Sequence, residues 1–155
     1  MNEANTLAQL RTVLEQDGIR AALRLLNSQT PHRFTALYRF DGETLKSLYF
    51  VDAENPEVES CPDIPVMASY CVFVRKTGNR FTVHDTLKDD RVEGHPKQRE
   101  VQSYCGVPLL DESGNLFGTI CVFDFESIPI GNDIVHMMEF LAPLLRQRDR
   151  TLKQG

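Results

Sequence analysis

Apolar residues near the start of the chain recur at helical spacing and are interrupted once. Leu7, Leu10 and Leu14 fall on one face of a helix. The pattern stops at Gly18 and resumes with Ile19, Ala22, Leu23 and Leu26. Because a glycine within such a pattern marks a break, the spacing predicts two consecutive helices within residues 1–28.

Two strand-like runs follow in the stretch RFTALYRFDGETLKSLYFV, which begins at Arg33. Both runs are rich in Phe, Tyr and Leu, and Asp41 and Gly42 lie between them. Since both of these residues tolerate a positive φ, the pattern predicts a β-hairpin. Residues 53–65 are acidic and contain three prolines, which indicates a loop.

The spacing then becomes helical again for a short stretch. Met67, Tyr70, Cys71 and Val74 share one helical face, and Gly78 follows where a C-terminal cap is expected. Residues 80–85 are typical of a strand, and Pro96 is expected to open a brief helix through Gln102.

The last part of the chain predicts two more strands and a long helix. The stretch SYCGVPLLDESGNLFGTICVFD, residues 103–124, has two apolar runs joined by a turn-forming segment. Residues 131–153 then form a helical pattern, with one apolar face made by Ile134, Met138, Leu141, Leu145 and Leu152.

Composition narrows the class of protein. With 155 residues, of which 41% are hydrophobic, the chain has the size of one domain with a real core. Its 17 Lys and Arg are scattered among 22 Asp and Glu, which argues against a nucleic-acid partner. The sequence shows neither a basic leader nor an apolar run of the roughly 20 residues that cross a membrane. A cytoplasmic protein without a membrane partner is therefore expected.

The four cysteines, at positions 61, 71, 105 and 121, lack the spacing of a zinc site and the density of a disulfide framework. We expect free thiols. The sequence also shows no phosphate-binding loop and no nucleophile beside a base. It therefore assigns no catalytic residue, no metal site and no cofactor.

Three stretches resemble a known family. They are RFTALYRFDG, SYCVFVRKTGNRFTVHDTLKDDRVEGHP and, most specifically, YCGVPLLDESGNLFGTICVFD. The last is similar to the recurrent GAF-domain pattern of small-Val-Pro-Leu, an acidic turn with glycine, Gly-Thr, an apolar triplet and aromatic-Asp. The resemblance extends over nearly the whole chain.

The resemblance implies one α+β domain over residues 1–155, layered α/β/α around an antiparallel sheet of about six strands. The terminal helices, residues 1–28 and 131–153, would cover one face of the sheet formed within residues 33–124. The segments 52–70 and 85–104 would cover the other face, with a small-molecule cavity beneath the second segment. Gly118 is expected to permit the close approach of a covering segment.

The sequence departs from members whose ligands are known. TGNRFTVHD keeps only part of the cyclic-nucleotide motif, and neither Cys71 nor Cys61 is followed by the histidine typical of bilin carriers. Members that reduce free methionine sulfoxide have a cysteine in the second cover, whereas none lies between Cys71 and Cys105 here. Binding of a cyclic nucleotide, attachment of a bilin and reduction of free methionine sulfoxide are therefore all disfavoured.

Six residues are candidates for the cavity wall: Tyr38, Tyr70, Cys71, His84, Asp85 and Tyr104. Each has an alternative role, because a buried cysteine usually acts as a small hydrophobe and a buried tyrosine is common in cores. His84 and Asp85 are adjacent, so an extended strand would direct only one of them to the cavity. Asp85 is as well suited to a hydrogen bond that fixes a loop. Cys105 and Cys121 would approach across their hairpin if Leu110 pairs with Leu116 or Phe117.

The sequence favours a small-molecule-binding sensory or regulatory domain that signals through its terminal helices. No effector domain follows Gly155, so output is expected in trans, through an effector protein or by self-association. Two alternatives stay open: a thiol-dependent reductase of the free methionine sulfoxide type, and an interaction scaffold whose cavity is filled.

A homodimer is the expected assembly. One sheet face is too narrow to cover both terminal apolar stripes, and exposed apolar patches of that extent usually mark an interface. The candidate interface residues are Leu7, Leu10, Leu14, Met138, Leu141 and Leu145.

Overall fold

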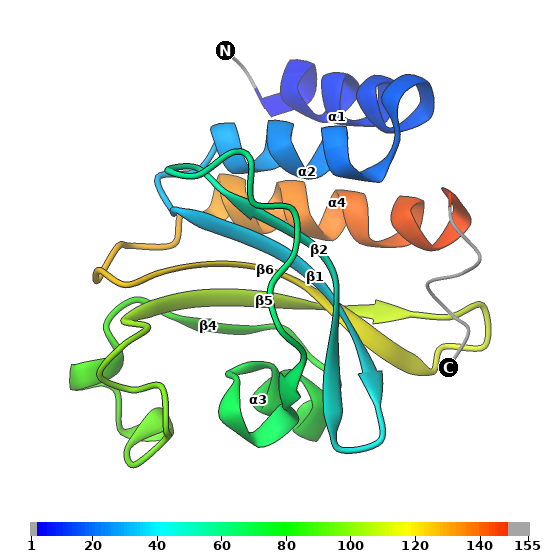
Figure 1. Ribbon diagram of the computed structural model, residues 1–155. Helices are drawn as coiled ribbons and strands as arrows, with labels where there is room; N and C mark the ends of the chain where they lie inside the picture. Colours follow the sequence, from blue (N-terminus) through cyan, green and yellow to red (C-terminus); the bar gives the residue numbers. More distant parts are fainter. Residues whose placement is uncertain (1–2, 149–155) are drawn as a thin grey trace.

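The structure, a computed structural model, describes residues 3–148 and has three layers. The helices are α1 (Glu3–Asp17), α2 (Ile19–Ser28), α3 (Cys71–Thr77) and α4 (Asn132–Arg148). The strands are β1 (Phe34–Asp41), β2 (Thr44–Asp52), β3 (Ile64–Pro65), β4 (Phe81–Val83), β5 (Ser103–Leu110) and β6 (Leu116–Asp124). Three 3₁₀ turns are η1 (Val66–Ala68), η2 (Thr86–Lys88) and η3 (Asp90–Val92). Helices α1, α2 and α4 lie on one side of the sheet and α3 on the other (Figure 1).

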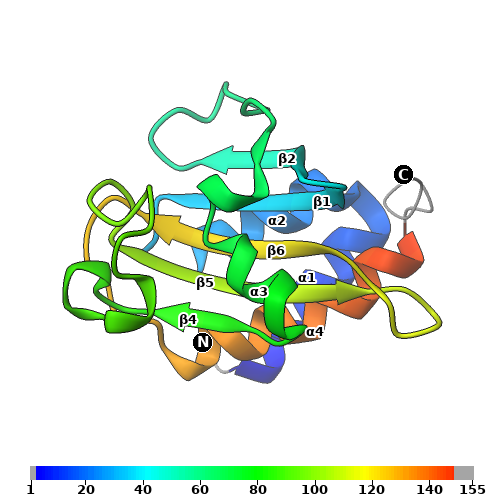
Figure 2. The ribbon, with the colours of Figure 1, turned by 90° about the horizontal axis from the view of Figure 1, so that it is seen from below.

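All strand pairs are antiparallel, and the strand order is β3-β2-β1-β6-β5-β4. The covering segments and α3 cross the face opposite the long helices (Figure 2). This arrangement confirms the expected α+β class and the antiparallel sheet. The sixth strand, β3, lies in the stretch that the sequence indicated to be a loop.

Two glycines end helices where the pattern predicted. Gly18 separates α1 from α2 with a φ of 95°, a conformation that side chains with a Cβ rarely adopt. Gly78 caps α3 in the left-handed region, and its N–H donates to Val74 O over 2.8 Å. By contrast, residues 96–100 form turns rather than the expected brief helix. The side chain of Gln98 there binds Gly94 N and Thr86 O, which holds the segment as a folded loop.

The helical layer buries the apolar stripes that were expected to form a dimer interface. Leu10, Leu14, Met138, Leu141 and Leu145 are at most 3% exposed and pack together in the core between helices and sheet. Leu7 is half-buried against the same core.

The inference that these side chains lie on the surface is therefore wrong, because α1 packs on α2 and α4, which in turn pack on the sheet (Figure 1). Leu152 and the expected end of the last helix lie outside the described residues. Within residues 3–148, every helix is too short or too polar to span a lipid bilayer.

The aspartate that ends the most specific motif joins the two central strands. Asp124 Oδ2 accepts a hydrogen bond from Arg33 N at 2.8 Å, and Oδ1 accepts one from Glu126 N at 2.9 Å. One carboxylate therefore fixes the beginning of β1 against the end of β6. This contact explains why an acidic residue suits the last position of the motif.

Gly118 also serves the β1–β6 contact, rather than the approach of a covering segment as the sequence suggested. A Cβ at this position would collide with the backbone carbonyl of Tyr38 in β1. A backbone carbonyl within a ladder cannot move aside without disturbing the strand. Gly118 is therefore needed for the close approach of β6 to its paired strand β1.

We predict that Gly118→Ala lowers the free energy of unfolding by about 1–3 kcal/mol, the usual cost of overpacking. Gly131→Ala is the matched control, because the atom it would meet belongs to the exposed side chain of Asp133, which can rotate away. Urea denaturation of both variants measures the difference. Equal stability of Gly118→Ala and wild type would contradict the backbone clash.

Candidate functional site

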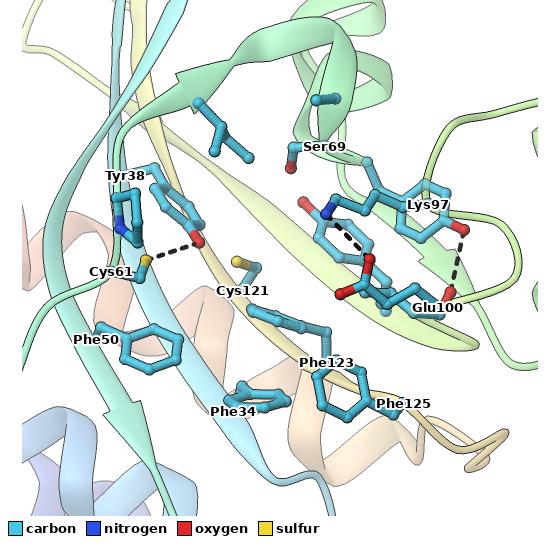
Figure 3. A pocket seen from close by; sticks show the side chains of 16 residues that line it. Phe34, Tyr38, Phe50, Cys61, Ser69, Lys97, Glu100, Cys121, Phe123 and Phe125 are labelled. Atoms are coloured by element: carbon cyan, nitrogen blue, oxygen red, sulfur yellow. Dashed lines mark hydrogen bonds and ion pairs between the residues drawn. The ribbon is translucent and has the colours of Figure 1, made fainter. Parts of the chain in front are cut away.

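A pocket of about 310 Å³ lies between the sheet and the covering segments. Strands β1, β2, β5 and β6 and the residue after β6, Phe125, form its floor and one wall, and residues from both covers form the rest (Figure 3). The cavity thus lies under both covers, not only under the second as expected. The lining residues are Phe34, Tyr38, Phe50, Cys61, Pro62, Ile64, Ala68, Ser69, Tyr70, Lys97, Glu100, Val101, Tyr104, Cys121, Phe123 and Phe125.

Phenylalanine rings form one end of the pocket. The ring centroid of Phe34 lies 5.6 Å from that of Phe50 and 5.0 Å from those of Phe123 and Phe125. Phe34 and Phe123 face each other because their strands pair directly at these residues. Such offset and edge-to-face contacts hold the rings in place and present apolar surface to the cavity.

Behind this aromatic wall, Arg33 anchors two of the rings. Its guanidinium lies 4.8 Å from the ring centroid of Phe34 and 5.6 Å from that of Phe125. Its Nε and Nη2 donate to the two carboxylate oxygens of Asp52 at 2.8 and 3.1 Å. These hydrogen bonds from Arg33 are the main reason why the pKa of Asp52 falls from 3.8 to about 2.

The two covers are tied to each other at the pocket. The hydroxyl of Tyr70 donates to Val101 O at 3.0 Å. His95 Nδ1 accepts from Lys97 N at 3.0 Å, and Nε2 lies 3.1 Å from Ser69 O. Since Nδ1 accepts, Nε2 carries the proton and donates, so the neutral ring joins both covers.

The pocket has no uncompensated charge among its lining residues. Lys97 and Glu100 are the two charged members, and their side chains pair at 3.1 Å, 34% and 57% exposed (Figure 3). Within the described chain, no cluster of three or more His, Cys, Asp or Glu side chains is arranged to hold a metal ion.

Three thiols lie at or near the floor. Cys121 and Cys61 line the pocket, and Cys61 Sγ lies 3.6 Å from the hydroxyl of Tyr38. Cys71 is fully buried, with its Sγ 3.2 Å from both Tyr104 Oη and Thr119 Oγ1.

Small residues on the neighbouring strands leave room for this arrangement. Cys121 pairs directly with Ala36 on one side and Gly106 on the other. The ring of Tyr104 occupies the space that a Cβ on Gly106 would need. Gly106 thereby lets Tyr104 lie across the sheet towards Cys71.

Burial and hydrogen bonding set the ionisation of these groups. Burial raises the pKa of Tyr70 to about 12 and those of Tyr38 and Tyr104 well above their usual range. Burial also opposes ionisation of Cys71, but hydrogen bonds from Cys121, Ser69, Thr119 and Tyr104 outweigh it and lower its pKa to about 7. Burial, and then its contact with Cys71, raise the pKa of Cys121. The pKa values of these two neighbouring thiols are therefore shifted in opposite directions.

The structure brings together only part of the predicted site. Tyr38, Tyr70 and Tyr104 line the pocket, and Cys71 lies beneath Tyr104 without lining it. His84 and Asp85 lie outside the pocket lining and fix loops instead.

The loop contacts of these two residues are specific. His84 Nδ1 accepts from Ile130 N at 2.8 Å, which fastens the segment after β6. Asp85 Oδ1 accepts from Leu87 N at 3.2 Å and caps η2. Asp85 therefore makes the loop-fixing hydrogen bond that was its alternative to a place in the cavity wall.

The cysteines of the β5–β6 hairpin are not cross-strand neighbours. Leu110 does pair with Leu116, but a bulge next to Leu109 shifts the register. Cys105 therefore pairs with Val122 and faces the helices, whereas Cys121 faces the pocket. The expected approach of the two sulfurs is wrong for this reason.

Sequence reasoning missed the phenylalanines and the cover residues. The alternation Phe34, Ala36, Tyr38 and the alternation Cys121, Phe123 are signals of one strand face, and they could have identified the aromatic wall. Lys97 and Glu100 lie in turns, where side-chain direction has no period that a sequence reveals.

The sequence and the fold were compared with known proteins. The family model described as "GAF domain" matches residues 14–148. The chain belongs to the GAF domain family. No curated protein matches the sequence.

Solved structures with this fold include a free methionine-R-sulfoxide reductase from Neisseria meningitidis in complex with its substrate. It has a TM-score of 0.76 and 17% identity, with 98% of this chain and 90% of that chain covered. The GAF domain of an Acinetobacter phosphoenolpyruvate-protein phosphotransferase has a TM-score of 0.75 and 13% identity, with 96% and 94% covered. A phycoerythrobilin-bound GAF domain from a cyanobacterial phytochrome has a TM-score of 0.72 and 12% identity, with 96% and 94% covered. At these identities the likeness concerns the fold, which GAF domains of different function share.

The ion pair behind the aromatic wall predicts a pH dependence of this GAF domain. Because the pKa of Asp52 is lowered on folding, its ion pair with Arg33 stabilises the fold above pH 3.8 and loses this effect as the pH falls towards 2. We expect Asp52→Asn to be less stable than wild type near neutral pH, and the gap to close across that range. Denaturant midpoints at several pH values test this. Glu57→Gln, in an exposed loop, is the control and should show no such convergence.

Proposed function

We propose that this GAF domain is a sensory or regulatory domain that binds a neutral, largely aromatic small molecule. The aromatic pocket supports the proposal most directly. A cavity of about 310 Å³, with four phenylalanines at one end and tyrosines along its sides, suits a compact planar ligand. Burial of apolar surface would supply most of the binding free energy.

The charge balance of the pocket favours a ligand without net charge. Lys97 and Glu100 already neutralise each other at 3.1 Å, and Arg33 is paired with Asp52 behind the wall. An anionic ligand would have to separate Lys97 from Glu100 or remain unpaired in an apolar cavity, which is unfavourable. The pocket therefore selects for shape and apolar surface.

The central strands offer a route from the pocket to the terminal helices. Along β1 and β6, Phe34, Tyr38 and Cys121 face the pocket, while Leu37 and Ile120 pack under the helices. A ligand that orders the covers would bias the packing of α1, α2 and α4 through these strands, as a shift between conformations. We propose that the signal reaches an effector protein in trans or acts through homodimerisation, in the cytoplasm.

Two other functions compete with this proposal. Reduction of free methionine sulfoxide draws support from the shared fold and from thiols at the pocket floor. Against it, the second cover contains no cysteine, and Cys71 is enclosed behind Tyr104. An interaction scaffold with a filled cavity fits poorly with the open volume of the pocket. We therefore propose a binding protein rather than an enzyme.

Titration with the neutral aromatic fluorophore N-phenyl-1-naphthylamine tests the pocket. We expect saturable binding that Phe125→Ala weakens by about three- to tenfold, the range for loss of one aromatic contact. Leu87→Ala is the control, since it truncates an exposed apolar side chain that is not part of the pocket lining. The anionic relative anilinonaphthalene sulfonate should bind more weakly. Equal effects of both variants, or a preference for the anion, would contradict the proposal.

Sedimentation velocity tests the proposed homodimer. We expect a dimer of the full chain at tens of micromolar, because a two-fold homodimer is the commonest assembly of soluble oligomeric proteins. Because Leu141 and Leu145 are buried inside the subunit, charged residues there would unfold the chain and test nothing about assembly. A single monomeric species over the whole concentration series would remove dimerisation from the signalling mechanism.

A further inference from the structure

Two buried thiols meet at the pocket floor. Thr119 and Cys121 are two residues apart on β6, so both side chains project to the same face of the sheet. Cys71 Sγ lies 3.2 Å from Thr119 Oγ1, and Cys71 and Cys121 lie close enough for each to shift the pKa of the other. Residues 50 positions apart in the chain are thereby brought close together by the packing of α3 on the sheet.

The surroundings of Cys71 favour its thiolate without a cation. The hydroxyls of Tyr104 and Thr119 each lie 3.2 Å from the sulfur. Both hydroxyls can turn their hydrogens towards a sulfur that has lost its proton. The neighbouring thiol of Cys121 adds a further donor. A thiolate is the reactive form of cysteine, so this arrangement prepares one member of the pair for chemistry.

The pair is placed asymmetrically with respect to the cavity. Both side chains are 0% exposed, but Cys121 lines the pocket, whereas Cys71 lies behind the ring of Tyr104 and does not line it. The ladder neighbours of Cys121 are small, Ala36 on β1 and Gly106 on β5, and the ring of Tyr104 takes the space beside Gly106. A molecule in the pocket therefore approaches the pair from the side of Cys121.

We propose that Cys71 and Cys121 form a redox pair that a small hydroperoxide entering the pocket oxidises to a disulfide. The thiolate sulfur attacks one peroxide oxygen, the O–O bond breaks, and a sulfenic acid forms. The departing alkoxide or hydroxide takes up the proton that the pair had released. The second thiol then attacks the sulfenic sulfur, forming the S–S bond and releasing water. Overall, the two thiols lose two electrons. An organic hydroperoxide is reduced to an alcohol and one water, and hydrogen peroxide is reduced to two waters.

The other two cysteines are less suited to this reaction. Cys105 faces the helices, where burial raises its pKa to about 11. Cys61 lines the pocket, but its polar neighbours are the hydroxyls of Tyr38 and Ser47, at 3.6 and 3.2 Å. Both residues therefore serve as internal controls. The inference does not depend on which molecule the pocket binds, so it can fail or hold independently of the proposed function.

Peptide mapping of the full chain after oxidation tests the pair. The reduced protein is treated with a small excess of hydrogen peroxide, its remaining thiols are alkylated, and it is digested without reductant. Trypsin leaves Cys71 in residues 47–75 and Cys121 in residues 100–146, and a second cleavage at Asp and Glu separates them from Cys61 and Cys105. We expect a Cys71–Cys121 linkage, loss of two hydrogens from the intact mass, and full reversal by a thiol reductant.

Variants separate the roles of the four cysteines. Cys105→Ser should form the same linkage at the wild-type rate, and Cys61→Ser should still form the same linkage. In Cys121→Ser, or Cys121→Ala if the serine variant does not fold, the sulfenic acid at Cys71 should persist and be trapped by dimedone once the oxidised chain is unfolded in denaturant. Thiols that remain reduced in wild type, a linkage through Cys61 or Cys105, or absence of trapping at Cys71 would each overturn the proposal. Mapping of the wild-type chain decides the question even if both Cys121 variants unfold.

Discussion

The pairing of β1 with β6 at the centre of the sheet is the constraint on which the rest of the structure depends. Both strands are covered on both faces, so each of their side chains must serve either the helical core or the pocket. The two backbones approach so closely that Gly118 has no room for a Cβ beside Tyr38. Asp124 then fixes the ends of the strands through Arg33 N. The positions of the aromatic wall and of the thiols follow from this register.

The pocket exists because the two faces are closed by different kinds of structure. Three long helices seal one face with interlocking apolar side chains. The other face is covered by a short helix, 3₁₀ turns and loops, which are joined at a few points such as Tyr70 with Val101 and His95 with Ser69. Irregular segments present fewer side chains to the sheet, so a cavity remains between them and the phenylalanines. These few contacts between the covers are also the ones that a ligand can most easily reorganise.

The chemistry of the pocket follows from its lack of net charge. Where no cation is available, the hydroxyls of Tyr104 and Thr119 are the groups that can stabilise a buried thiolate. The same apolar walls that favour a neutral ligand raise the pKa values of the tyrosines and of Cys121. The proposed ligand binding and the proposed thiol chemistry would therefore share one environment, although they would involve different atoms.

Much of the fold could be predicted from local patterns. The break at Gly18, the hairpin around Gly42, the cap at Gly78 and the strands of the final motif all depend on residues near in sequence, where φ preferences and side-chain periodicity act directly. The same periodicity could have identified Phe34 and Phe123 as neighbours of Tyr38 and Cys121.

Other features depended on contacts between distant segments. The apolar stripe containing Leu141 predicts burial, but only the stacking of α1 and α2 beside α4 decided that it is buried within the subunit. A bulge near Leu109 decided that Cys105 and Cys121 face opposite layers. His84 meets Ile130 rather than the pocket because the chain after β6 returns to that edge. The sequence by itself therefore determined most of the elements and the family, because local geometry encodes them. Tertiary packing alone decided the pocket and its thiol pair, since these arise where segments of unrelated spacing meet.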